Sequence, residues 1–172
     1  VAFSTGILRT MSRGGLAGVS AHEVAHIKNG DMVTLTLIQG VINAFIMFFA
    51  RVIAFFVSQA VEEKSRELVR FLVVIGSEIL LGILGMMVVS WFSRQREFRA
   101  DEGSARVAGR EQMISALKQL QVVVDRRTEK AGLPEAMAAF GINGKEGGFM
   151  SLLSTHPPLS ERIRALETMR IN

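Results

Sequence analysis

The stretch on which the organisation of this chain depends is Ala21-His22-Glu23-Val24-Ala25-His26-Ile27-Lys28-Asn29-Gly30-Asp31. On an α-helix, residues four apart lie on the same face, so His22 and His26 can direct ring nitrogens at one point. Zinc accepts imidazole nitrogen, and a catalytic zinc site uses three protein ligands and keeps a position open for water. Glu23 is placed to take a proton from that water. The spacing predicts a zinc hydrolase with His22 and His26 as metal ligands and Glu23 as general base.

The residues around the motif predict a helix from Leu16 to Lys28. Ser12 is a candidate N-cap, and Asn29-Gly30 ends the helix because glycine accepts the left-handed conformation found at helix ends. Uncharged residues flank the histidines, which favours a partly buried helix. The alternative for two histidines at this spacing is an ordinary solvated helix face.

Composition indicates a membrane protein. The length of 172 residues predicts one domain, 1–172. Hydrophobic residues make up 49% of the chain and the mean hydropathy is +0.32, which is high for a soluble domain. The net charge of +4 then favours contact with anionic lipid headgroups, and no nucleic acid partner is predicted because no DNA- or RNA-reading motif is present. Without cysteine there is no disulfide framework. The chain begins at Val1 without Met, and we interpret it as a fragment of a longer protein.

Two long apolar runs, Met32 to Ala50 and Phe71 to Phe92, predict an inserted hydrophobic helical hairpin over 32–93. Each run is long enough to cross a hydrocarbon core of about 30 Å. Ser58 to Arg70, between the runs, has mixed charges and is expected to be a solvated loop or helix end. The hairpin is interpreted as two membrane spans. The alternative is a buried helical hairpin in a soluble domain.

Charged and small residues mark particular positions in the hairpin. Gly40 and Ala44, four apart, predict a small-residue face for close helix contact. Arg51 follows the first run and Glu78 interrupts the second, so a hairpin would bring them to similar depth, where pairing lowers the cost of burial. The two residues are a structural pair, two groups that snorkel to the interface, or a polar functional site within the membrane.

Two spans return the chain to the side of the membrane from which it entered. The helix predicted from Leu16 to Lys28 and the residues after the second apolar run therefore face the same compartment. Arg94, Arg96 and Arg99 cluster close to that second run. Basic residues near span ends favour the cytoplasmic side, which predicts an active site facing the cytoplasm.

The third metal ligand is expected in the helical sequence from Arg96 to Gly109. Glu97 and Asp101 are four apart on one face, and a carboxylate suits zinc beside two imidazoles. Glu97 is therefore the candidate ligand. Asp101, one turn further, can accept the free ring N–H of a ligand histidine and fix its tautomer. The alternative is that both carboxylates pair with neighbouring arginines.

His156 is a second candidate catalytic residue. Pro157 and Pro158 hold it at the entry to a helix expected from Leu159 to Met169. A histidine fixed in this way can donate a hydrogen bond to the oxyanion of a tetrahedral intermediate. The alternative is that it packs against the turn. Arg162 can pair with an acidic group near the site or contact the substrate, and the sequence does not decide between them.

The remaining segments carry structural predictions. Val1 to Thr10 resembles the end of a β-strand with a bend at Gly6, either an edge strand beside the site or a core strand. Glu111 to Asp125 has Met113, Leu117, Leu120 and Val124 at helical spacing, which predicts a core helix. A short helix is expected over 135–140 and a flexible loop over 141–148.

Three motifs in a fixed order, with the apolar runs between the first two, give the chain a family resemblance. They are His22-Glu23-Val24-Ala25-His26-Ile27-Lys28-Asn29-Gly30-Asp31, Phe92-Ser93-Arg94-Gln95-Arg96-Glu97-Phe98-Arg99-Ala100-Asp101 and Thr155-His156-Pro157-Pro158-Leu159-Ser160-Glu161-Arg162-Ile163. Together they resemble the HtpX family, heat-shock-associated, membrane-bound zinc metalloproteases of bacteria (gluzincin type). The resemblance spans nearly the whole chain.

The resemblance implies a mainly α, zincin-like metallopeptidase domain with Zn²⁺ on His22, His26 and Glu97 and with Glu23 as base. It also implies a multi-pass inner-membrane endopeptidase that hydrolyses misfolded or damaged membrane proteins, and further N-terminal hydrophobic segments outside this sequence. Two alternatives stay open: a prenyl-protein-processing membrane metallopeptidase, and a non-catalytic membrane scaffold with an incidental motif.

Overall fold

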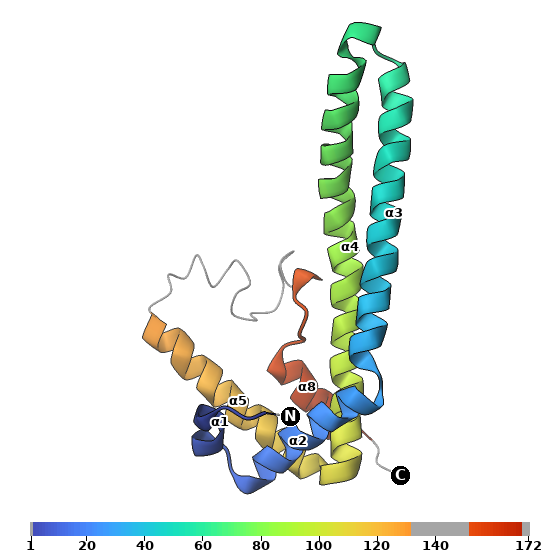
Figure 1. Ribbon diagram of the computed structural model, residues 1–172. Helices are drawn as coiled ribbons and strands as arrows, with labels where there is room; N and C mark the ends of the chain where they lie inside the picture. The colour runs from blue at the N-terminus through green and yellow to red at the C-terminus, as the bar shows by residue number, and fades with distance from the viewer. Residues whose placement is uncertain (1, 132–151, 170–172) are drawn as a thin grey trace.

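The computed structural model describes residues 2–131 and 152–169, and in this part of the chain the regular structure is helical (Figure 1). The helices are α1 (Thr5–Thr10), α2 (Arg13–Lys28), α3 (Asp31–Gln59), α4 (Glu63–Ala108), α5 (Arg110–Ala131) and α8 (Leu159–Thr168). The prediction of a mainly α fold is confirmed. The segments 135–140 and 141–148 lie outside the described residues.

The predicted N-terminal β element is wrong. Thr5 to Thr10 form α1, and Ser4 caps it by accepting a hydrogen bond on Oγ from the Ile7 N–H at 3.3 Å. A strand needs a neighbouring strand to satisfy its backbone N–H and C=O groups, and the described residues contain no strand. A helix satisfies these groups within the segment itself, so the bend expected at Gly6 is replaced by a helical turn.

Helix α2, which carries the two histidines, ends where the sequence predicts. Its N-cap is Ser12, whose Oγ accepts from the Gly15 N–H at 3.1 Å, and the helix starts at Arg13, earlier than expected. At its other end Gly30 has a φ of +65°, a left-handed conformation that favours glycine. Because α3 begins at the next residue, Asp31 lies immediately beyond the end of α2.

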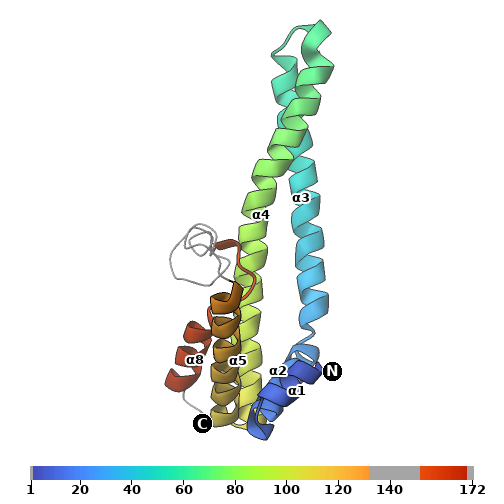
Figure 2. The same ribbon diagram turned by 90° about the vertical axis from the view of Figure 1, so that its left-hand side faces the viewer.

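Helices α3 and α4 form a hairpin that rises from the cluster of the other helices (Figures 1 and 2). With 29 residues, α3 is about 44 Å long, and α4, with 46 residues, is about 69 Å long. Residues 60–62 alone separate them, so most of the polar segment Ser58 to Arg70 is helical. Its Glu, Lys and Arg residues are good helix formers and sit at the solvated tip. Helix α4 also continues past the apolar run, so one helix carries both that run and Glu97.

Helix–helix contact in the hairpin is set by Gly85 rather than by Gly40. A Cβ on Gly85 would lie 2.9 Å from side-chain atoms of both Ile42 and Ile46, whereas a Cβ on Gly40 would have no atom within 4 Å. Within the described residues, Gly40 therefore makes no close helix contact, and the small-residue face predicted at Gly40 and Ala44 is not the one that joins α3 to α4. The side chains of Ile42 and Ile46 thus occupy the space that a side chain at Gly85 would take.

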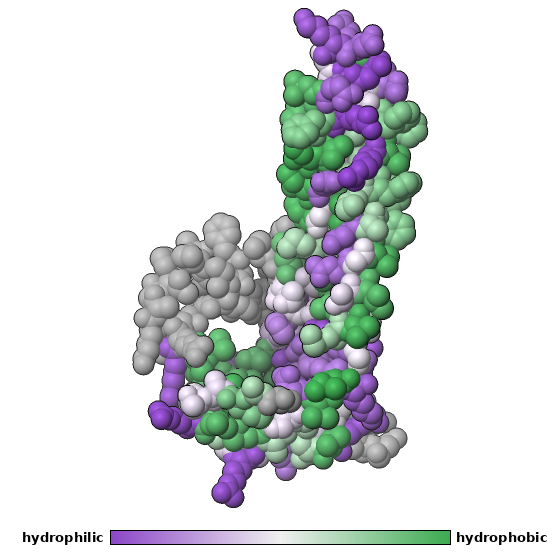
Figure 3. Space-filling model, in the orientation of Figure 1, coloured by the Kyte–Doolittle hydropathy of each residue, from purple (hydrophilic) through white to green (hydrophobic). Residues whose placement is uncertain are grey.

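The hairpin exposes most of its apolar side chains (Figure 3). Both α3 and α4 are long and apolar enough to cross a membrane, and only 11% and 6% of their most apolar windows are buried. The hairpin is thus not a buried core of the described chain. Arg51 and Glu78 lie at the same depth, with Nη1 3.7 Å from Oε1, as predicted for a hairpin.

The hydrophobic core lies at the base of the hairpin. It is formed by the C-terminal end of α4, the N-terminal part of α5 and helix α8. Its buried members are Ala105, Met113, Ile114, Leu117, Ile163 and Leu166. Within the predicted stripe of α5, Met113 and Leu117 are buried, but Val124 is exposed, so the core stripe ends earlier than predicted. Helix α2 packs against both α4 and α5 and is held at the edge of this core.

Candidate metal centre

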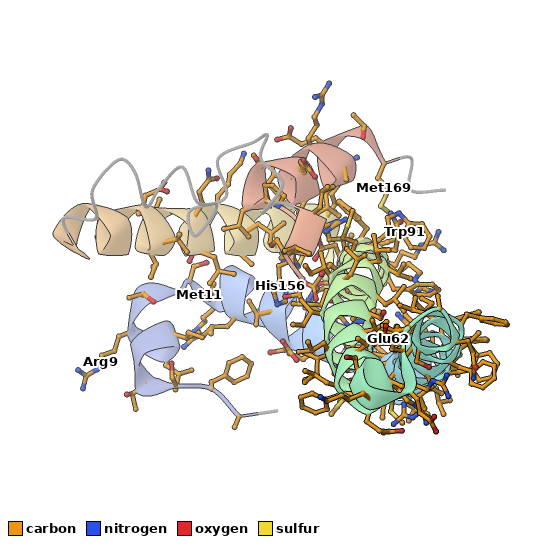
Figure 4. The ribbon with its side chains drawn as sticks, turned by 90° about the horizontal axis from the view of Figure 1, so that it is seen from above. Arg9, Met11, Glu62, Trp91, His156 and Met169 are labelled. Carbon is orange, nitrogen blue, oxygen red and sulfur yellow. The ribbon has the colours of Figure 1, made fainter. Side chains whose placement is uncertain are left out.

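The candidate site lies where α2, the lower half of α4 and α8 meet. Helix α2 supplies His22, Glu23 and His26, and α4 supplies Glu97. His156 lies among these helices just before α8 (Figure 4). Ser104 of α4 ties the helices together by donating from Oγ to the Gly18 carbonyl at 2.8 Å. Residues more than seventy positions apart in the sequence are thus brought to one place.

His22, His26 and Glu97 form a group that could hold a metal ion, with ligand atoms within 4.8 Å of one another. The two Nε2 atoms lie 3.0 Å apart. Glu97 Oε2 is 3.6 Å from His22 Nε2, and Oε1 is 3.5 Å from His26 Nε2. Tetrahedral zinc with bonds of about 2.0–2.1 Å places its ligand atoms roughly 3.3–3.4 Å apart. Two nitrogens and one oxygen at these separations fit zinc in both chemistry and spacing.

The other ring nitrogen of each histidine faces a buried carboxylate. His22 Nδ1 lies 2.9 Å from Asp101 Oδ1, and His26 Nδ1 lies 2.6 Å from Asp31 Oδ2. A carboxylate at Nδ1 favours the tautomer that carries its proton there, which leaves Nε2 free to bind a metal. Asp101 lies where the sequence predicts a partner for a ligand histidine.

Asp31 was not predicted as a site residue, although its position directly after Gly30 is a signal. Gly30 ends α2 in the left-handed conformation. This conformation turns the chain, so that the following residue, Asp31, faces the last turn of α2. The acid five positions after His26 therefore lies beside that ring. Arg96 reinforces the arrangement by donating from Nη1 to the Asp31 carbonyl at 3.3 Å. Asp31 is only 3% exposed, so water cannot replace it.

Arg162 pairs with acidic groups at the site, which is one of the two roles left open by the sequence. Its Nε and Nη2 donate to the two oxygens of Asp101 at 2.7 and 2.6 Å. Its third nitrogen, Nη1, lies 3.1 Å from Glu97 Oε2. The guanidinium is buried and all three nitrogens face carboxylates, so it fixes both acids in place.

The electrostatics keep Glu97 ionised. Burial alone raises the pKa of Glu97, but contacts with His156, His22, His26 and Arg162 outweigh burial and hold the pKa well below its usual range. Burial lowers the pKa of His22, and the nearby carboxylates of Asp101 and Glu97 reverse this and raise the pKa to about 9. For His26, the contact with Glu97 raises the pKa against the opposing effect of burial.

A cleft of about 370 Å³ opens onto these groups. Glu23 is exposed and lines it together with both histidines. Its lining also includes the apolar side chains of Met113, Leu117 and Leu120 of α5, a helix for which the sequence predicted no role in the site. The cleft therefore places a carboxylate, a candidate metal site and an apolar surface around one space.

His156 lies at the mouth of the cleft. Its Nδ1 is 3.5 Å from Glu97 Oε1, and 66% of its side chain is exposed. It faces the candidate metal site without joining the group of three ligands in the described structure. All of the predicted site residues therefore border one region.

The model of peptidase family M48 matches residues 1–170. The chain belongs to peptidase family M48. Among similar M48 relatives, the Protease HtpX homolog of Methylacidiphilum infernorum is 52% identical over 97% of this chain and 57% of its own length. Protease HtpX of Mannheimia succiniciproducens is 52% identical over 99% of this chain and 59% of its own length. The predicted HtpX resemblance is confirmed.

This M48 chain spans less than two thirds of the length of the relatives it matches. No solved structure matches it. Membership of family M48 implies a metal, usually zinc, and the group of His22, His26 and Glu97 could bind it.

Proposed function

We propose that this chain is the catalytic part of a zinc-dependent endopeptidase. The observation that carries the proposal is the convergence of His22, His26 and Glu97, from two different helices, on one point within a cleft that Glu23 also lines. Membership of family M48 and the similarity to Protease HtpX support it independently.

In this proposal His22, His26 and Glu97 hold zinc. When bound, zinc supplies Lewis acidity, which makes water a better nucleophile at neutral pH and polarises a substrate carbonyl. Glu23 takes a proton from the attacking water as the new C–O bond forms at the peptide carbonyl carbon. It then gives that proton to the leaving nitrogen as the C–N bond breaks. One proton is taken and one is returned, so Glu23 is ready for the next cycle.

The surrounding residues orient these groups. Asp101 and Asp31 hold the two imidazoles in the tautomer that exposes Nε2. Arg162 holds Asp101 and Glu97 together. His156, exposed at the mouth of the cleft, donates a hydrogen bond to the oxyanion of the tetrahedral intermediate.

We place the protein in the bacterial inner membrane with its active site on the cytoplasmic side. The exposed apolar hairpin supports two spans of a multi-pass protein. The arginines that follow the second apolar run support the cytoplasmic orientation. A site at the base of a hairpin in the membrane lies close to other membrane proteins. We therefore propose misfolded or damaged membrane proteins as the substrates, and the lipid bilayer as the second partner.

The test compares the wild type with Glu23→Gln, each purified in detergent and assayed for bound zinc and for cleavage of casein and of an unfolded membrane protein. We expect one zinc per chain in both proteins and proteolysis only in the wild type. Lys28→Gln, at an exposed position of the same helix, is the matched control and should keep full activity. Absence of zinc from the wild type would instead support a scaffold. Cleavage restricted to prenylated peptides would support a prenyl-protein-processing enzyme.

A further inference from the structure

A second cavity lies along the hairpin between α3 and α4, outside the candidate metal centre. It has a volume of about 550 Å³. Apolar side chains form most of its wall, but it also contains polar ones: Gln39, Asn43, Glu78, Ser90 and Thr155. Figure 3 shows polar side chains interrupting the apolar surface along the hairpin. We call this cavity the hairpin groove.

Two amides in the hairpin groove are without partners. Gln39 and Asn43 lie one turn apart on α3, both are exposed, and neither side chain hydrogen-bonds within the described part of the chain. An amide that lies in hydrocarbon without a hydrogen-bond partner costs free energy. Such amides therefore hydrogen-bond to polar side chains or backbone groups of a neighbouring helix. Lipid acyl chains cannot satisfy them, so the groove suits a polypeptide with hydrogen-bonding groups.

With a volume of about 550 Å³, the groove has room for side chains of such a segment when the segment packs against α3 and α4. Gly85 lines the groove where α4 contacts α3, against the side chains of Ile42 and Ile46. Gly82, which also lines the groove, has no atom within 4 Å of where its Cβ would lie. The groove is therefore open at Gly82, about one turn before the contact at Gly85.

The groove leads to the catalytic cleft. Ser90 Oγ donates to the Leu153 carbonyl at 2.9 Å and Arg94 Nη1 donates to the Ser154 carbonyl at 2.9 Å, which holds this segment against α4. Thr155 of the segment lines the groove, and the next residue, His156, lines the cleft. An occupant of the groove would therefore have its end beside the candidate metal site.

We propose that the hairpin groove binds a transmembrane segment of the substrate, one that carries polar side chains such as Asn, Ser or Thr within its apolar sequence. Gln39 and Asn43 bind those side chains, and the chain that continues from the segment enters the cleft. This inference rests on the proposed endopeptidase function. It adds a selection step, because stably folded membrane helices seldom leave polar side chains unsatisfied, whereas misassembled ones do.

The first test fills the groove. Gly82→Leu places a large side chain in it, and Gly76→Leu is the matched control, because Gly76 also has open space around it on α4 but does not line the groove. We measure kcat/KM for a membrane-embedded substrate with Asn and Ser in its single span, and for soluble casein. Gly82→Leu should lower the value for the membrane substrate by about tenfold or more. Casein cleavage, and both activities of Gly76→Leu, should stay within about twofold of the wild type.

Equal cleavage of the membrane substrate by Gly82→Leu and the wild type would overturn the groove while leaving the peptidase intact. A wild type that cleaves neither substrate would instead refute the proposed function. These two failures are therefore distinguishable.

The second test needs no catalysis. The chain contains no cysteine, so one introduced cysteine is unique. In the Glu23→Gln background, Asn43→Cys should form a disulfide with a cysteine in the span of the bound substrate, whereas Val41→Cys, exposed on α3 but outside the groove, should not. Equal cross-linking of both variants would overturn the proposal. Cross-linking of Asn43→Cys only to a second copy of the chain would also overturn it, in favour of a dimer interface.

Discussion

Replacing Asp31 by Asn tests whether the carboxylate that follows α2 orients His26, a candidate metal ligand. Asp31 Oδ2 lies 2.6 Å from His26 Nδ1, slightly shorter than the usual charge-assisted N–H···O hydrogen bond of about 2.7–2.9 Å. The substitution keeps the size of the side chain and removes its charge. It also permits the amide nitrogen to face Nδ1, in which case His26 would carry its proton on Nε2 and could not bind metal through that atom.

The structure sets the expected magnitude. Asp31 is 3% exposed, so water cannot take over the role of the lost carboxylate oxygen. Substitution of residues that orient metal-bound histidines typically costs about 10–100-fold in metal affinity. We expect the upper half of this range for Asp31→Asn, about 30–100-fold or roughly 2–2.7 kcal/mol, because the contact is short and buried.

The measurement is a zinc titration of the metal-stripped protein against a chromophoric chelator of known affinity. Glu102→Gln is the matched control: it removes the same charge from α4, where Glu102 pairs at 2.7 Å with Arg106 on the exposed face. We expect its zinc affinity to equal that of the wild type. A Kd for Asp31→Asn within about threefold of the wild type, or an equal loss in the control, would refute the reasoning.

Three further predictions concern packing, the buried ion pairs and the metal. Gly18→Ala would place a Cβ 2.8 Å from the Gln112 carbonyl oxygen, so it should lower the free energy of unfolding by about 1–3 kcal/mol. Gly14→Ala, whose Cβ would have its nearest atom at 3.7 Å, should be tolerated. Thermal unfolding of the two variants distinguishes them. Arg162→Met leaves Asp101 buried without its bidentate partner and should cost about 3 kcal/mol or more by chemical denaturation, and an unchanged midpoint would contradict this. A strong chelator should lower the midpoint of thermal unfolding and added zinc should restore it, because zinc at a hundred times its Kd stabilises the folded state by about 2.7 kcal/mol.

Short-range periodicity explains which parts of the site could be predicted. The i, i+4 spacing places His22 beside His26, and Glu97 one turn before Asp101, in any helix that contains them. Pairing of Arg51 with Glu78 required only that two adjacent helices of similar span run antiparallel. These predictions depended on helix geometry, which is the same in every fold.

The sequence-based predictions that failed depended on tertiary surroundings. The first ten residues contain β-branched and aromatic residues around Gly6, which suit a strand only where another strand is available to pair with it. Asp31 was missed because its role depends on the direction of the chain after Gly30, which a hydrophobicity pattern does not encode. Gly40 and Gly85 are both glycines in apolar helices, and only the packed hairpin distinguishes the one at the contact.

One continuous helix, α4, joins the hairpin to the candidate metal site, because it runs through both without a break. Glu97 can lie 3.5 Å from His26 only if α2 and α4 pack unusually closely, and Gly103 permits this: a Cβ there would lie 2.9 Å from the Cβ of Ala25. Both hairpin helices also contribute a residue to the site, since Asp31 begins α3 and Glu97 lies in α4. A change in the spacing of α3 and α4 at the base of the hairpin would therefore change the distance between Asp31, the partner of His26, and the candidate metal ligand Glu97. The groove therefore lies between the same two helices that carry Asp31 and Glu97.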